Sequence, residues 1–372
     1  MKIILLTALF FTMLCAAGTD TNASAHKRLV LGGVEVLPGS NVTIAIELPK
    51  LYNMPVELPV QVIRGKEDGP TVFVSAAIHG DELNGIEIIR RFRNQKILEE
   101  LKGTVILVPI VNVYGVINRT RYLPDRRDLN RHFPGSVKGS LASRIAKIFT
   151  DEIVSKCDLG IDLHTAAMHR SNLPQIRTDI DNPETLRLAK AFEAPVVLHS
   201  RLRDRSLRAS GLESGVPILL YEAGEALRFD ETSIRIGVKG ILNVLYAKGM
   251  LPNKIGEHTT KSPIVVRSTH WLRASQSGMI QMVKGLGDTV KEHEIIAYIS
   301  APLEEKTYEI RALYDGIIIG KLEIPLIQEG DAVFNIANFG NLEAANRKIE
   351  FFSEDIIQEN SLCGFSDEEV IE

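Results

Sequence analysis

The sequence predicts an α/β protein whose mixed sheet is flanked by helices and followed by a smaller all-β domain. Between residues 26 and 261, apolar runs typical of buried strands alternate with helical patterns, which indicates a sheet with helices on both faces. After residue 261 the helical pattern disappears, and short strands separated by Gly, Pro and Asp follow. A chain of 372 residues is long enough for two or three domains.

Residues 1–25 have the pattern of a secretory signal peptide. Lys2 precedes an apolar run over residues 3–17, and a small-x-small site ends at Ala25. The run is too short for a stable membrane span, so we predict an exported protein, periplasmic or extracellular, without a span after cleavage. An uncleaved N-terminal anchor is the alternative. Lipoprotein processing at Cys15 is disfavoured, because Leu14 is larger than the small residue that usually precedes such a cysteine.

The predicted α/β domain, residues 26–261, begins with two strands in which apolar and polar residues alternate, at 42–46 and 60–63. The strands that follow are nearly continuous apolar runs, which is the mark of strands buried on both faces. They are predicted at residues 72–77, 104–111, 159–163, 195–198 and 217–221. The helices between and after them are predicted from apolar spacing at residues 86–92, 140–153, 183–193 and 234–248.

The second predicted domain, residues 262–345, has the pattern of a small barrel or sandwich. Its strands are predicted at residues 278–280, 287–290, 295–299, 310–312, 316–319 and 330–336. Two Gly-Asp turns, at residues 287–288 and 330–331, each begin a similar apolar strand, which suggests a quasi-repeated, hammerhead-like unit. Residues 346–372 are acidic and weakly patterned, and we expect a partly ordered tail there.

Composition excludes several classes of function. The net charge is −4 with 24% charged residues, whereas a nucleic-acid surface needs a clustered excess of Lys and Arg. Without the signal peptide the cysteines that remain are Cys157 and Cys363, far apart and with no CxxC pair. Thiol-based metal sites are therefore not expected, and a disulfide between the two cysteines is left open.

The stretch AAIHGDELNG, residues 76–85, follows the strand predicted at 72–77 and contains the first candidate ligands. His79 and Glu82 are three residues apart, and Gly80 permits an unusual turn that would let both side chains converge. Imidazole and carboxylate are good zinc ligands, but hydrolytic zinc also needs a third protein ligand and an open position. Alone, the pair also fits a turn histidine beside a solvated glutamate.

A third ligand is predicted at the end of another buried strand. His164 directly follows the run at residues 159–163, and Asp162 is a plausible acceptor that orients an imidazole. Asp162 could equally be a structural residue near the strand end. His169 competes for the ligand role, but it lies in the loop beyond the strand. We therefore expect His164 to be the ligand.

Two further groups supply candidate catalytic and binding residues. Glu222 follows the apolar run at residues 217–221, where a carboxylate needs a partner or a function, and beside a metal it could act as a general base. Glu225 is the alternative, although it lies beyond Gly224. Residues 121–135 form a basic, irregular loop whose guanidinium groups could clamp a carboxylate or stabilise an oxyanion. Taken alone, this loop also fits an ordinary solvated surface segment.

The segments HGDE, DLNR, DLHT and YEAG, in this order, resemble the succinylglutamate desuccinylase/aspartoacylase family, which belongs to the carboxypeptidase A-like zinc hydrolases. The resemblance covers roughly residues 60–340 and implies a zinc carboxypeptidase-like fold with one zinc ion per chain. It assigns the metal ligands His79, Glu82 and His164 and the catalytic carboxylate Glu222. It also implies that Asn130 and Arg131 grip a substrate carboxylate and that Arg127, or next Arg121, stabilises the oxyanion.

The activity implied by this resemblance is zinc-dependent removal of an acyl group from an N-acyl amino acid or similar small amide with a carboxylate. A metallocarboxypeptidase acting on short or cell-wall peptides, and a non-catalytic zinc-containing binding protein, are the alternatives. The best-known members act on cytosolic metabolites, whereas this chain is predicted to be exported. No residue specifies which acyl group is removed.

The predicted β domain also resembles a biotinyl/lipoyl hammerhead, in which a carrier lysine occupies a hairpin tip. Lys306 lies in the corresponding turn, residues 301–306, but without a Met-Lys context. We therefore predict a structural or substrate-restricting domain. Its first residues, His270, Trp271 and Arg273, are expected near the mouth of the active site.

Overall fold

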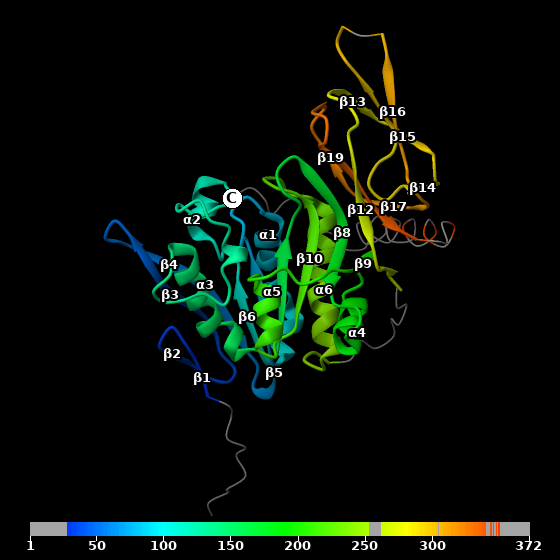
Figure 1. The fold of residues 1–372 in the computed structure, drawn as a ribbon. Helices are drawn as coiled ribbons and strands as arrows, with labels where there is room; N and C mark the ends of the chain where they lie inside the picture. The colour runs from blue at the N-terminus through cyan, green and yellow to red at the C-terminus, as the bar shows by residue number, and fades with distance from the viewer. Residues whose placement is uncertain are drawn as a thin grey trace, which may run out of the picture.

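The computed structural model describes residues 28–252, 262–303 and 305–339, together with positions 343, 345, 347 and 349. The predicted signal peptide, Cys363 and, apart from positions 347 and 349, the predicted acidic tail lie outside the described residues. A twisted sheet runs through the body of the molecule with helices on both faces, and the C-terminal strands rise from one end of it (Figure 1). In the described part of the chain, no helix is long and apolar enough to cross a membrane.

The central sheet places β4, β6, β5, β7, β10 and β8 side by side, with β3 beyond β4. Pairing of β5 with β6 and β7, and of β7 with β10, is parallel. Strand β4 runs antiparallel to β3 and β6, and β8 runs antiparallel to β10 but parallel to β9. The strands are β3 (Asn41–Leu51), β4 (Met54–Arg64), β5 (Glu67–Ala76), β6 (Lys102–Val108), β7 (Leu159–His164), β8 (Arg170–Thr178), β9 (Val196–His199) and β10 (Ile218–Glu225). The parallel strands therefore end at the same edge, where ligands gather in α/β proteins.

Helices cover the two faces of this sheet and bury separate apolar clusters. The helices α1 (Asn84–Phe92), α4 (Pro183–Ala191) and α6 (Glu231–Ala247) pack on one face. The other face carries α2 (Val113–Asn118), α3 (Leu141–Glu152) and α5 (Leu207–Glu213), with the hairpin of β1 (Leu29–Leu31) and β2 (Val34–Val36). Short 3-10 turns lie at Lys96–Glu100, Leu129–Arg131 and Val154–Lys156.

Local chemistry explains where the longer helices begin. The side chain of Ser140 accepts from the backbone N–H of Ser143 at the start of α3, and Asp230 caps α6 in the same way through Ser233. Asn182 caps α4, and Pro183 occupies its first turn. These are favourable capping residues because they satisfy N–H groups that have no partner inside the helix.

The C-terminal strands form two layers around an apolar core of their own, which includes Ile296, Ile318 and Phe334. One layer is a sheet of β16 (Thr307–Arg311), β15 (Ile295–Ser300), β13 (Gly278–Met282) and β18 (Leu326–Ile327). The other contains β12 (Thr269–Arg273), β19 (Ala332–Asn338), β17 (Gly316–Leu322) and β14 (Thr289–Val290). The predicted all-β part is thus present, while the hammerhead repeat stays a prediction.

The two parts of the chain share one sheet rather than meeting only at their surfaces. Strand β17 pairs with β8 of the central sheet, and β11 (Ile264–Val266) pairs with β9. The alternation of strands and helices is confirmed, but β8, α2 and α5 in the α/β part were not predicted. The sequence of β8, RSNLPQIRT, contains a proline and mostly polar residues, and proline normally counts against an interior strand.

Candidate metal centre and active-site cleft

The ends of two parallel strands bring the candidate ligands together. His164 is the last residue of β7, and His79 and Glu82 lie in the turn directly after β5. That turn starts at Ala77 with a φ of 51°. At Gly80 the backbone passes so close to α2 that an added Cβ would lie 2.0 Å from the carbonyl carbon of Gly115. The tight turn directs His79 and Glu82 toward β7.

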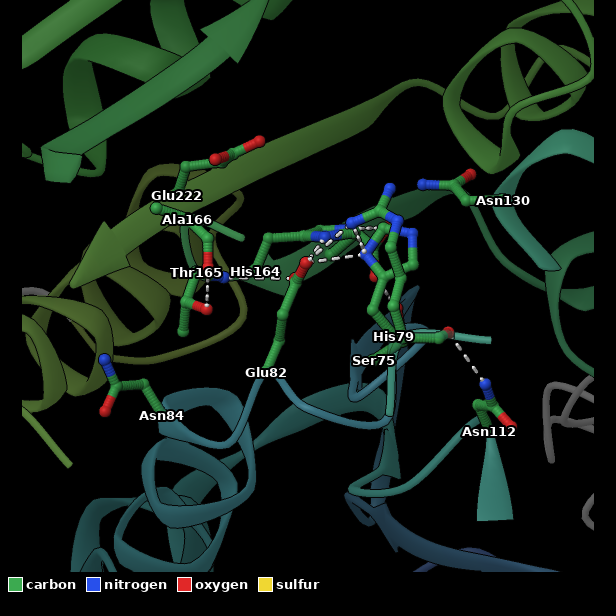
Figure 2. Close-up of polar contacts among 12 residues, drawn as sticks. Ser75, His79, Glu82, Asn84, Asn112, Asn130, His164, Thr165, Ala166 and Glu222 are labelled. Atoms are coloured by element: carbon green, nitrogen blue, oxygen red, sulfur yellow. Dashed lines mark hydrogen bonds and ion pairs between the residues drawn. The ribbon is translucent and has the colours of Figure 1, made fainter. Parts of the chain in front are cut away.

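His79, Glu82 and His164 form a buried cluster whose ligand atoms lie within 4.8 Å of one another. One carboxylate oxygen of Glu82 is 2.7 Å from Nδ1 of His79, and the other is 2.7 Å from Nδ1 of His164 (Figure 2). Two imidazole nitrogens and a carboxylate are the donor set of many hydrolytic zinc sites. The cluster could therefore hold a metal ion.

Each imidazole of the cluster is oriented by a second carboxylate. Nε2 of His164 lies 2.8 Å from Asp162, and Nε2 of His79 lies 3.1 Å from Asp128. Ser75 donates to Asp162 at 2.7 Å and holds that carboxylate in place. A carboxylate on one ring nitrogen keeps the proton there and leaves the opposite nitrogen free to ligate. The arrangement presents both Nδ1 atoms to the same point, which fits a metal ion.

Glu222 lies beside this cluster because its strand is the parallel neighbour of β7. In the register of β10 and β7, Glu222 pairs with His164. Its Oε2 accepts a hydrogen bond from Nδ2 of Asn172 at 2.6 Å, and its Oε1 lies 3.4 Å from Nη1 of Arg177. The side chain is 16% exposed and lines the same cavity as the cluster. The carboxylate is thus placed to exchange a proton with a molecule bound there.

The cavity has a volume of about 370 Å³ and is strongly basic. Its arginines are Arg121, Arg131, Arg170, Arg177, Arg203 and Arg208, and its acidic residues are Glu82 and Glu222. Arg208 is buried, and burial together with the nearby charge of Arg177 lowers its pKa to about 10. A concave surface lined by one sign of charge attracts ligands of the opposite sign. The cavity therefore suits a small anionic molecule.

Comparison with known proteins relates this arrangement to a family. Residues 68–247 match the model of the succinylglutamate desuccinylase/aspartoacylase catalytic domain. The chain contains a stretch similar to the catalytic domain of this family, and the matched residues make up just under half of its length. An N-alpha-acetyl-L-2,4-diaminobutyric acid deacetylase from Halomonas elongata is 27% identical in an alignment 296 positions long that covers 76% of this chain and 86% of that protein.

Solved structures show the same fold. The crystal structure of a succinylglutamate desuccinylase/aspartoacylase from Rhodobacter sphaeroides has a TM-score of 0.71 and 26% identity, covering 80% of this chain and 95% of that one. The product-bound ectoine utilization protein EutE (DoeB) from Ruegeria pomeroyi has a TM-score of 0.72 over the same shares, at 24% identity. At this coverage the similarity includes both the family's catalytic domain and strands beyond it.

The structure places Arg121, rather than the favoured Arg127, beside the metal cluster. Nη1 of Arg121 lies 3.2 Å from Glu82, and its Nε and Nη2 donate to Asp128 at 3.2 and 2.9 Å. Arg127 is half exposed, points to Asp125 at 3.5 Å and does not line the cavity. Both arginines belong to one irregular loop, so spacing in the sequence could not separate them. Asp128 itself was not predicted.

The other predicted residues divide between the cavity and the surface around it. Asn130 and Arg131 line the cavity, and Oδ1 of Asn130 accepts from the backbone N–H of Leu207, so its amide nitrogen faces the cluster (Figure 2). His169 and Glu225, the alternatives to His164 and Glu222, are not among the lining residues.

The layer of C-terminal strands that contains β12 and β17, called the C-terminal layer below, contributes one side chain to the cavity. Trp271 of β12 lines it, and the guanidinium of Arg170 lies 5.6 Å from the Trp271 ring centre. His270 instead packs against Tyr314, and Arg273 donates to a backbone carbonyl at Gly330. The expectation that this segment reaches the mouth therefore holds for the tryptophan alone among the three.

Lys306 and the residues missed by sequence reasoning also have defined places. The ammonium of Lys306 lies 4.5 Å from the Tyr308 ring centre.

The cavity residues that were not predicted come mainly from β8 and from α5 with the loop before it: Arg170, Asn172, Arg177, Arg203 and Arg208. Their polar, proline-containing or short segments lack the apolar periodicity that identifies strands and helices.

Charges within the cluster alternate and shift one another's pKa values. Burial raises the pKa of the Glu82 carboxyl, but His79 and His164 outweigh it, so that the net shift is downward. Burial lowers the pKa of both histidines, yet the neighbouring carboxylates raise the pKa of His79 above its ordinary value and that of His164 well above. Without a cation, the imidazoles therefore retain protons that a metal ion must displace.

Metal binding should release protons near neutral pH. Because the pKa values of His79 and His164 are raised, the protonated forms compete with the metal at a higher pH than ordinary imidazoles would. Affinity is expected to fall as the pH drops through these raised values. Calorimetric titration with zinc in buffers of different ionisation enthalpy measures the protons released. Binding without proton release would show that both imidazoles are already neutral.

Replacing Asp128 by Asn should weaken metal binding roughly 10–100-fold, the usual effect of removing a carboxylate behind a ligating histidine. The matched control is Asp125→Asn, which changes an acid of the same loop that pairs with Arg127 and contacts no cluster residue. Competition with a fluorescent chelator gives both affinities. Equal affinities in the two variants would remove the orienting role of Asp128.

Proposed function

We propose that the protein is a zinc-dependent hydrolase that removes the acyl group from an N-acyl amino acid or a similar small amide bearing a carboxylate. The observation that carries this proposal is the pairing of Glu222 with His164, which puts a carboxylate beside a three-residue metal cluster in a basic cavity. The match of residues 68–247 to the family's catalytic domain supports it, as does the similarity to the relative from Halomonas elongata, which is named as a deacetylase of an acetylated diamino acid.

The chain's own residues supply the parts that amide hydrolysis needs. Zinc held by His79, Glu82 and His164 would polarise the amide carbonyl and make a water molecule more acidic. Glu222 takes a proton from the attacking water and delivers it to the departing nitrogen, and the same carboxylate acts first as base and then as acid. Because Oε2 is engaged by Asn172, we assign these proton transfers to Oε1.

Arginine and asparagine side chains account for binding and charge stabilisation. Arg121 lies beside Glu82 and is one-quarter exposed, so its guanidinium can approach the oxygen on which negative charge develops. Asn130 and Arg131 lie on the cavity wall and are proposed to hold the carboxylate of the substrate. This division of roles assigns the oxyanion to Arg121 in place of Arg127.

The size and charge of the cavity favour a small acylated amino acid over a long peptide. A volume of about 370 Å³ accommodates a compact ligand, and Trp271 of β12 forms part of the cavity wall. The metallocarboxypeptidase alternative requires room for a peptide chain on the acyl side of the scissile bond, since only the terminal residue lies beyond that bond. The predicted signal peptide adds the proposal that the reaction takes place in the periplasm or outside the cell.

Glu222→Gln should retain about one zinc ion per chain and lose roughly 10²–10⁴-fold in kcat, the usual contribution of general acid–base catalysis. The matched control is Glu225→Gln, which changes a carboxylate on the same strand that pairs with Arg228 outside the cavity. Zinc content and hydrolysis of a panel of N-acyl amino acids are measured together.

The same panel separates the alternatives. Full activity of Glu222→Gln would remove the proposed base, and preferential cleavage of long peptides would favour a metallocarboxypeptidase. A wild type that holds zinc but hydrolyses neither class would favour a zinc-containing binding protein.

Arg121→Ala should lower kcat about 10²–10³-fold, the range for loss of one oxyanion-stabilising donor. Arg127→Ala, its control in the same loop, should stay close to the wild type because its side chain faces Asp125 at the surface. Zinc content is measured in both, since Arg121 also contacts Glu82 and Asp128. A larger kcat loss in Arg127→Ala would reverse the assignment.

A further inference from the structure

The side chain of Asn172 is the short-range partner of the proposed base. It lies on β8, is 5% exposed, and its Nδ2 donates to Oε2 of Glu222 at 2.6 Å. Its Oε1 lies farther from a partner, 3.4 Å from Nη1 of Arg177. The terminal torsion of a glutamate is broad, so the carboxylate of Glu222 depends on such partners for its orientation.

The backbone around Glu222 makes this side-chain contact more important. The register of β10 against β8 shifts between Glu222 and Gly224, and Gly224 has a φ of 75°. Regular pairing is therefore interrupted next to the base, and irregularities of this kind re-aim side chains near functional sites. Asn172 spans the interruption, since it pairs with Gly224 while its amide reaches Glu222.

On its other side, Asn172 touches the C-terminal layer. Strand β17 pairs with β8, and Gly320 is the Cα partner of Asn172. A Cβ added to Gly320 would lie 3.0 Å from Oδ1 of Asn172 and 3.3 Å from Cβ of Asn335. Gly320 does not have a left-handed φ, so the tight contact, rather than the backbone, is what a larger residue would disturb.

We propose that Asn172 is a positioning residue that holds Glu222 in its working orientation, and that Gly320 of the C-terminal layer holds Asn172 in turn. The inference rests on the proposed role of Glu222. It gives the C-terminal strands a part in the reaction itself, in addition to the contribution of Trp271 to the cavity wall. A Cβ added to Gly320 would also lie 3.5 Å from the Trp271 ring, which is an ordinary van der Waals contact, whereas its 3.0 Å approach to Oδ1 of Asn172 is the tighter one.

Kinetics of the full-length, zinc-loaded protein test this proposal through two variants. Asn172→Ala removes the donor, and Gly320→Ala displaces it by a few tenths of an ångström from the neighbouring strand. Both should lower kcat, roughly 10–100-fold for the asparagine, with KM little changed, because misorientation of a reacting group affects the chemical step. Asn335→Ala is the control. It removes another buried carboxamide, on the strand that pairs with Gly320, and this carboxamide is not a hydrogen-bond partner of Glu222.

Non-additivity shows whether Asn172 acts through Glu222. In a Glu222→Gln background, Asn172→Ala should produce no further loss of kcat, because the group that it orients has already been disabled. A further loss as large as in the wild type, or a rise in KM with kcat unchanged, would overturn the proposal.

Crystal structures of the two variants provide a readout that does not depend on turnover. The Glu222 carboxylate should be rotated or spread over several orientations in Asn172→Ala and in Gly320→Ala, and unchanged in Asn335→Ala. An unmoved, well-ordered Glu222 in the first two would overturn the inference even in an active enzyme. If the wild type hydrolysed none of the N-acyl amino acids, the proposed function would fail, while these structures would still decide the positioning role.

Discussion

The buried carboxylate of Glu82 is the constraint around which the site is built. A charge this deeply buried, with 2% of the residue exposed, is costly unless it is paired and hydrogen-bonded. The pairing runs outward through both imidazoles to Asp162 on one side and Asp128 on the other. Carboxylates and imidazoles alternate along this series of contacts, so each group favours the charged form of the next. A cation fits between the ligand atoms of His79, Glu82 and His164.

The register of the parallel strands turns this local pairing into a candidate catalytic site. His164 and Glu222 are cross-strand partners on β7 and β10, and β5 runs parallel on the other side of β7. Parallel strands present their carboxyl ends at one edge, so ligands and proposed base arrive there from segments far apart in the chain. A slip of one residue would turn Glu222 to the opposite face of the sheet and away from the cluster.

The C-terminal strands are joined to this sheet and so can influence its chemistry. Strand β17 continues the central sheet through β8, which puts Gly320 against Asn172 and leaves Trp271 at the cavity. An appended domain that met the body only at its surface could restrict access but could not reach a residue two strands away. Because β17 and β8 belong to one sheet, the side chain of Asn172 connects the proposed base with the C-terminal strands.

The alternation of strands and helices, and the polar residues at the strand ends, can be predicted from the amino-acid sequence alone. Polar residues after continuous apolar runs made candidates of His79, Glu82, His164 and Glu222. Their roles were then implied by the resemblance of the four ordered segments to the family. Tertiary structure decided the partners of these residues. Arg121 and Arg127 look equivalent in one irregular loop, and Asp128, like the whole of β8, lacks periodicity. Contacts between distant segments depend on register and loop path, which no local pattern of side chains encodes.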